Sequence, residues 1–89
     1  MRPAKTIVVV VDTNRLGRVR EALRAAVGLG LRGDTVRLAT TAVAAPALDS
    51  QDPDIRRGLA TLRLLGRQLG DASDLADWLT TADVVQVWT

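Results

Sequence analysis

The sequence predicts a small α/β domain, and three observations lead to this fold class. Residues 5–40 have the pattern of a strand, a helix and a second strand. Residues 52–69 open with a strong helix start, and residues 84–88 form a β-branched run that is typical of a strand. A further short helix precedes that run. The predicted order is therefore β-α-β-α-α-β with a mostly parallel sheet, since a right-handed crossover makes the first two strands parallel.

The 89 residues are expected to form a single domain, spanning residues 1–89. A chain of this size buries only about 60–65% of the surface that it exposes when unfolded. The composition is 47% hydrophobic, but its only aromatic residues are two tryptophans, so the core must consist of Val, Leu, Ile and Ala. We therefore expect oligomerisation to supplement a marginal core.

The first strand is expected over residues 5–11, a continuous β-branched run that suits a central parallel strand covered on both faces. Asp12, Thr13 and Asn14 follow it and supply turn and N-cap side chains for the next helix. That helix has an apolar stripe at helical spacing. The stripe consists of Leu16, Val19, Leu23, Ala26 and Gly30.

A run of glycines in residues 28–33 matches the G-x-G-x-x-G pattern of dinucleotide sites. That pattern binds pyrophosphate only when the glycines follow a strand and open a helix. Here they close a helix and precede a strand, so we interpret them as C-cap and turn residues. Asp34 completes the turn, and the second strand is expected over residues 35–40.

Residues 41–51 are rich in small side chains and are expected to form a loop at the carboxyl end of the second strand. In open α/β sheets, ligands bind beyond the carboxyl ends of the strands. We therefore predict a site for a small ligand or a partner protein at this edge; a plain connector is the alternative. The site would consist of Asp12, Thr13, Asn14, Thr41 and Ser50.

The next helix begins at Asp52, the expected N-cap, with Pro53 at the first helical position. Its apolar stripe is expected to run from Ile55 to Leu69 and to include Leu59, Leu62 and Gly66. Leu64 projects away from this stripe and hints at a subunit contact, although a single exposed leucine needs no explanation.

On the same predicted helix, Arg56, Arg63 and Arg67 fall within a sector about 40° wide, at roughly 100° per residue. This basic ridge could bind an anion, and phosphate contacts would make it a salt-sensitive nucleic-acid-binding module. No aromatic side chain accompanies the arginines to stack on bases. A solvated helix face is the simpler interpretation, so we expect no nucleic-acid partner and keep that function as the alternative.

Residues 71–74 supply caps for a third helix, in which Leu75, Trp78, Leu79 and Ala82 share a face. Asp83 turns the chain into the last strand, expected over residues 84–88.

The composition excludes most catalytic chemistry, because the chain has no Cys, His or Tyr. Ser50 and Ser73 have no histidine to activate them, so we expect no catalytic residue and no enzyme activity. Asp52 and Asp54 are better explained as helix caps than as ligands of a hard cation. We expect neither a metal nor a cofactor.

The expected compartment is the cytoplasm. The sequence has neither cysteines for disulfides nor the pattern of a secretory signal. Its longest aliphatic run, residues 7–11, is far shorter than the roughly 20 residues that cross a bilayer.

Four stretches of the chain resemble the DsrE/DsrF-like proteins, which include the TusD-type subunits of sulfur relay. The stretches are residues 5–11, residues 19–26 together with residues 33–38, the helix of residues 55–69, and residues 82–85. Together they span most of the chain, but each is a pattern of residue types rather than a diagnostic motif.

The resemblance implies a flavodoxin-like, three-layer α/β/α subunit that assembles into trimers, hexamers or heteromeric rings. Members that transfer sulfur carry a persulfide on a cysteine in the loop after a third strand. The corresponding residues 66–71 contain neither a cysteine nor a convincing strand. A persulfide needs a thiolate. The expected function is therefore that of a non-catalytic subunit linked to sulfur relay, in a homo-oligomer or in a hetero-oligomer with a cysteine-bearing homologue.

Overall fold

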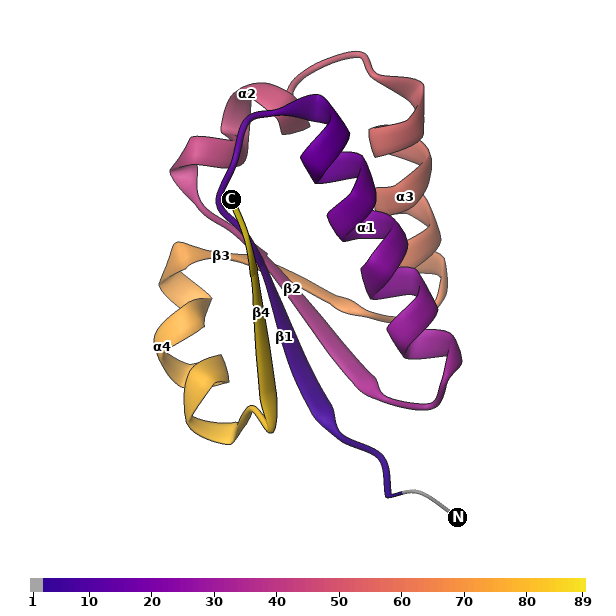
Figure 1. Ribbon diagram of the computed structural model, residues 1–89, viewed down its shortest axis with the longest axis vertical. Helices are drawn as coiled ribbons and strands as arrows, with labels where there is room; N and C mark the ends of the chain where they lie inside the picture. Colours follow the sequence, from indigo (N-terminus) through magenta and orange to yellow (C-terminus); the bar gives the residue numbers. More distant parts are fainter. Residues whose placement is uncertain (1–2) are drawn as a thin grey trace.

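A four-stranded, all-parallel sheet lies between two helical layers in the computed structural model of the protein, which describes residues 3–89. Helices α1 and α3 lie on one side of the sheet and α4 lies on the other (Figure 1). The expected three-layer α/β class with a parallel sheet is thus confirmed. The elements are β1 Thr6–Val11, α1 Leu16–Leu31, β2 Thr35–Thr40, η1 Ala42–Ala44, α2 Ala45–Leu48, α3 Pro53–Leu64, β3 Gln68–Asp71, α4 Ala72–Thr81 and β4 Val84–Trp88.

The strand order is β3-β2-β1-β4, so the chain moves outward from β1 to β3 and then returns to the other side of β1. This is the 3-2-1-4 order of doubly wound dinucleotide-binding folds, whereas flavodoxin has the order 2-1-3. The return crossover contains α4. Right-handed crossovers in opposite directions place their helices on opposite faces, which explains why α4 is separated from α1 and α3.

The amino-terminal ends of the strands are fixed by two carboxylates. Asp34 Oδ1 accepts a hydrogen bond of 3.1 Å from the Lys5 backbone N–H. Asp83 Oδ2 accepts one of 2.8 Å from the Thr6 N–H. These two aspartates come directly before β2 and β4, so each ties the start of β1 to the start of a neighbouring strand.

Strand β3 is an addition to the predicted β-α-β-α-α-β order, because the sequence left open whether residues 66–71 form a strand. Helix α3 ends at Leu64, and Gly66 turns the chain with a φ of +74°. Leu69 therefore lies in β3 opposite Leu38 instead of continuing the helical stripe. The sequence Gln-Leu-Gly-Asp has no strand periodicity of its own, so pairing with β2 and the packing of Leu69 against the core determine its conformation.

The loop expected at residues 41–51 is also corrected, because η1 and α2 occupy most of it. Ala44 and Ala47 are buried there and belong to the core. Small side chains thus allow this segment to pack closely over the carboxyl end of the sheet.

The core lies mainly on the α1 and α3 side of the sheet. Alternate residues of β1, namely Ile7, Val9 and Val11, join the cluster that α1 and α3 cover, and Leu38 of β2 and Ile55 of α3 complete it. On the opposite side, α4 has no fully buried residue. The two helical layers therefore contribute unequally to the core.

Helices α1 and α3 pack closely at Gly58. A Cβ added to Gly58 would lie 3.1 Å from both Cβ and Cδ1 of Leu23, a residue of the core. The glycine thus allows the two helices to approach.

Gly58→Val is expected to destabilise the fold by about 1–3 kcal/mol, because the extra side chain overpacks the α1–α3 contact. Urea denaturation followed by circular dichroism measures the change. Gly28→Ala in α1 is the matched control, since nothing lies within 4 Å of an added Cβ there. It should stabilise the helix by up to about 1 kcal/mol. Equal stabilities for the two variants would contradict the proposed tight contact.

Candidate functional site

The carboxyl ends of β1 and β2 bring Asp12 and Thr41 together, as the sequence predicted. The Thr41 N–H donates to the Val11 carbonyl oxygen at 3.1 Å. The Thr41 hydroxyl donates to Asp12 Oδ1 at 2.6 Å. Both residues are half-buried. The pair fixes the direction of the carboxylate at this edge, which lies below α2 in Figure 1.

Thr13 and Asn14 have different surroundings from Asp12. Thr13 is buried, and its Oγ1 accepts a hydrogen bond of 3.2 Å from the Arg15 N–H, whereas Asn14 is exposed. The expected N-cap is corrected, because the N-cap of α1 is Arg15 and no side chain caps that helix end. Thr13 therefore shapes the turn, and Asn14 has its amide open to solvent.

Ser50 lies in the turn between α2 and α3. Its hydroxyl donates to the Ala47 carbonyl oxygen at 2.6 Å and accepts from the Asp52 N–H at 3.3 Å. The predicted site residue thus serves the local backbone, and no hydrogen bond connects it with Asp12 or Thr41 in the described part of the chain.

A hollow of about 420 Å³ lies beyond the carboxyl ends of β2 and β3. Thr41 borders it together with Leu48 of α2 and with Asp71 and Ser73 at the start of α4. A neighbouring hollow of about 440 Å³ has Thr40, Leu48 and Asp71 in common with it. Its remaining lining residues are Leu38, Leu59, Arg63, Leu69, Gly70 and Asp74.

Both hollows combine apolar residues with the carboxylate of Asp71, and the second also has Arg63 and Asp74 in its lining. Apolar linings with a few polar groups are typical of small-molecule sites. The sequence analysis missed Asp71 and Ser73 as members of this edge. The N-cap pattern of residues 71–74 did predict a helix start, and recognition of β3 would have placed that start at the carboxyl edge of the sheet.

Asp71 is fixed by a capping box. Its side chain accepts a hydrogen bond of 2.9 Å from the Ser73 N–H, and the Ser73 hydroxyl also donates to it. Asp74 Oδ2 accepts a reciprocal bond of 3.0 Å from the Asp71 N–H. The Ser73 hydroxyl, followed by the Ser73 N–H, holds the pKa of Asp71 below its usual value. Asp71 is therefore an ionised acceptor near neutral pH.

The expected basic ridge is corrected, because Arg67 lies beyond the end of α3. Arg67 Nη2 donates to the Gly30 carbonyl oxygen at 3.0 Å, near the end of α1. Arg56 Nη1 donates to Gln51 Oε1 at 2.8 Å. Arg63 is exposed, and its side chain forms no hydrogen bond or ion pair with other residues in the range 3–89. The three arginines thus differ in role.

Arg20 of α1 and Asp52, the N-cap of α3, form an ion pair between the two helices. Asp52 Oδ1 also accepts hydrogen bonds from the Asp54 and Ile55 N–H groups, at 3.0 and 3.1 Å. The Arg20 hydrogen bond is the main cause that lowers the pKa of Asp52 to about 2, and the Ile55 N–H is the next.

Comparison of the chain with models of protein families, with curated proteins and with solved structures found no match. Across residues 3–89, no helix is both long and apolar enough to span a membrane. The same part of the chain has no group of three or more carboxylates suited to holding a metal ion.

Arg67→Met is expected to destabilise the fold by about 1–2 kcal/mol, because the Gly30 carbonyl loses a hydrogen bond from a charged donor. Arg63→Met is the control and should stay within about 0.5 kcal/mol, as is usual for a surface substitution. Chemical denaturation of both variants measures the difference. A larger loss for Arg63→Met would contradict this assignment of the two arginines.

Asp52→Asn is expected to lower stability at pH 7, because it removes the negative charge beside Arg20. The stabilisation from a carboxylate with a lowered pKa is complete above the unfolded-state pKa of about 3.9. It is lost as pH falls through the folded-state pKa of about 2. The urea midpoints of the wild type and the variant should therefore converge between about pH 4 and pH 2. Asp49→Asn, an exposed substitution just after α2, is the control and should leave the urea midpoint at pH 7 close to that of the wild type.

Proposed function

We propose that this chain is a non-catalytic, DsrE-like subunit that assembles into an oligomer in the cytoplasm. It binds a partner protein or a small ligand at the carboxyl ends of its strands. The oligomer is a trimer or hexamer of this chain, or a hetero-oligomer with a cysteine-bearing homologue that carries the sulfur of a relay.

The binding role is supported above all by the surface at the carboxyl edge of the sheet. There the bonded pair of Asp12 and Thr41 adjoins a hollow that also has Leu48, Asp71 and Ser73 in its lining. Ligands of open α/β sheets occupy this position. The edge offers carboxylate acceptors and an apolar lining but no thiol or imidazole.

The non-catalytic role is supported by the chain that follows β3. In the DsrE/DsrF-like proteins that transfer sulfur, a cysteine occupies the loop after the third strand. Here Asp71 ends β3 and caps α4 directly, with Ser73 bonded to it. These two side chains cap the amino-terminal end of α4, and neither supplies the thiolate that persulfide chemistry requires.

The assembly role is supported by exposed apolar residues away from this edge. Leu64 at the end of α3 is 88% exposed, and Val85 and Val87 of β4 are 44% and 58% exposed. Since the α4 layer contributes no fully buried residue, a second subunit could add apolar burial that the isolated chain lacks.

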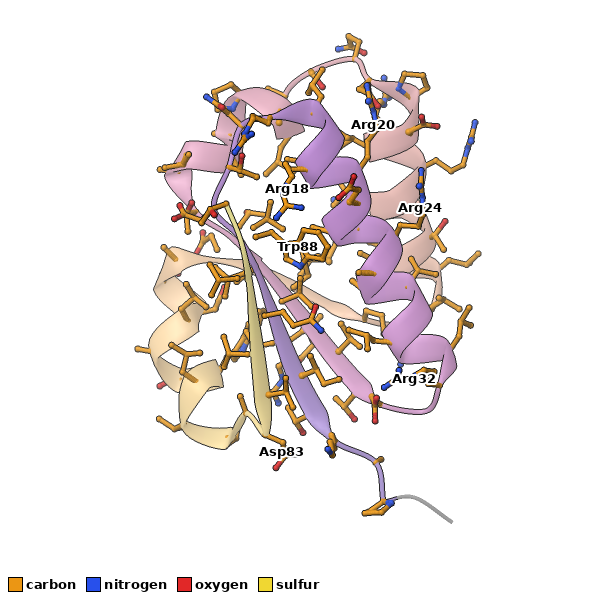
Figure 2. The ribbon with its side chains drawn as sticks, in the orientation of Figure 1. Arg18, Arg20, Arg24, Arg32, Asp83 and Trp88 are labelled. Atoms are coloured by element: carbon orange, nitrogen blue, oxygen red, sulfur yellow. The ribbon has the colours of Figure 1, made fainter. Side chains whose placement is uncertain are left out.

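A nucleic-acid-binding module is the alternative, and the groove between α1 and α3 is the observation that favours it. The groove encloses about 210 Å³, and Arg20, Arg24 and Arg57 contribute to its lining. Figure 2 shows Arg20 and Arg24 along the side of α1 that faces α3. Against this function, Asp52 pairs with Arg20, and Asp54 with Arg57 at 3.5 Å.

The native mass of the purified protein, measured from about 0.05 to about 0.5 M salt, distinguishes the two functions. We expect a discrete oligomer that survives high salt, because apolar contacts are not screened. Absorbance at 260 and 280 nm is followed in the same experiment. A monomer that releases nucleic acid as salt rises would refute the assembly role and favour the arginine groove.

A further inference from the structure

The two edges of the sheet differ in how well they are protected against pairing with another chain. Strand β3 has four residues and contains Gly70 and Asp71. Strand β4 has the sequence Val-Val-Gln-Val-Trp, without a charge, proline or glycine, and pairs with β1 along its whole length. Monomeric proteins usually protect a regular edge with charges, prolines or bulges. β4 has none of these.

The backbone of β4 is open for pairing at Val85 and Val87. The Trp88 carbonyl accepts a hydrogen bond of 2.8 Å from the Asp12 N–H, so it points toward β1. Backbone groups of successive strand residues point to alternate sides. The N–H and C=O groups of Val85 and Val87 therefore point away from the sheet.

The side chains of the same two valines are also exposed. Val84 and Trp88 pack against the core on the α1 side, so alternation places Val85 and Val87 on the α4 side. The contacts of α4 are mainly with β2 and β3, and the helix leaves both valines partly uncovered. Open backbone groups and apolar side chains thus coincide at one edge.

We propose that β4 pairs antiparallel with β4 of a second copy of this chain, forming a continuous eight-stranded sheet around a two-fold axis at Gln86. This inference rests on the proposed assembly role and names the contact that carries it. An axis at Gln86 places Val85 opposite Val87 of the second copy, and both strands then pair along their full length. Isologous pairing of this kind closes a dimer, and three such dimers could build a hexamer.

Charge complementarity favours a second copy in this register. Figure 2 shows Arg18 beside Trp88 at one end of β4 and Asp83 at the other end. The Arg18 guanidinium lies 4.7 Å from the centre of the Trp88 ring, and its Nε donates to the Thr89 oxygen at 3.2 Å. Antiparallel pairing brings Asp83 of each copy to the end where Arg18 of the other copy lies. Opposite charges therefore meet at both ends of the shared strands.

The first test uses lysine substitutions and native mass. Val85→Lys and Val87→Lys should each convert the assembly into smaller species, because a charge enters an apolar cross-strand pair. Leu31→Lys, at an exposed apolar position at the end of α1, is the matched control and should leave the native mass unchanged. Circular dichroism checks folding, which should persist because both valines have access to solvent.

The second test uses cysteine cross-linking and does not depend on losing the assembly. Cα atoms of a directly opposed, non-hydrogen-bonded antiparallel pair lie about 4.5 Å apart, within the range of about 4.4–6.8 Å that disulfides span. Gln86→Cys should therefore form a disulfide-linked dimer on mild oxidation. The chain has no native cysteine that could form other disulfides. Gln68→Cys on β3 is the control and should remain largely uncross-linked.

The outcomes separate this inference from the proposed function. An assembly that persists in both lysine variants of β4, with no cross-linking of Gln86→Cys, would overturn the β4 contact and leave the assembly role standing. A wild-type protein that is monomeric at all accessible concentrations would overturn both. Dissociation by Val85→Lys together with a Gln86→Cys dimer would support the two-fold sheet.

Discussion

The pairing of β1 with strands on both sides is the constraint on which the rest of the structure depends. β1 pairs in parallel with β2 from Thr6 to Val11 and with β4 from Ile7 to Val11. Its β-branched side chains are buried on both faces, and the hydrogen bonds that Asp34 and Asp83 accept from the Lys5 and Thr6 N–H groups fix its register at the amino-terminal end. The positions of Asp12 and Thr41 follow, because each is the residue directly after a paired strand end. The site is thus a consequence of strand register.

The unequal helical layers explain where the molecule has surface available for other molecules. α1 and α3 pack against each other and against one face of the sheet, where most of the core lies. α4 covers the other face less completely, and β4 ends the sheet without a protected edge. Apolar surface that would be buried in a larger domain therefore stays exposed at β4. The proposed ligand site at the carboxyl ends of β1 and β2 and the proposed pairing strand β4 are separate, so one subunit could bind a ligand and assemble at the same time.

Sequence patterns predicted the elements whose signals are local. The β-branched run before Asp12, the Asp52-Pro53 helix start and the strand of residues 84–88 all lie where expected. β3 was missed because Gln68, Gly70 and Asp71 have low strand propensity and the pairing with β2 decides the conformation. Asp12 and Thr41 were predicted to meet because parallel strands share one edge. Arg67 was wrongly placed on the helix that carries Arg56 and Arg63. That helix ends at Leu64 and the chain turns at Gly66, whereas the predicted ridge required the helix to continue to Arg67.

The hydrogen bond that Asp83 accepts from Thr6 connects residues 77 positions apart in the sequence. The strand that flanks β1 on its second side is therefore synthesised after β1, β2 and β3. Until β4 arrives, one edge of β1 stays open while β2 and α1 can already pack against it. Formation of this sheet is consequently governed by a long-range loop closure, which slows folding relative to helical domains of equal length. During synthesis, the open edge of β1 would be the segment most in need of protection from other nascent chains.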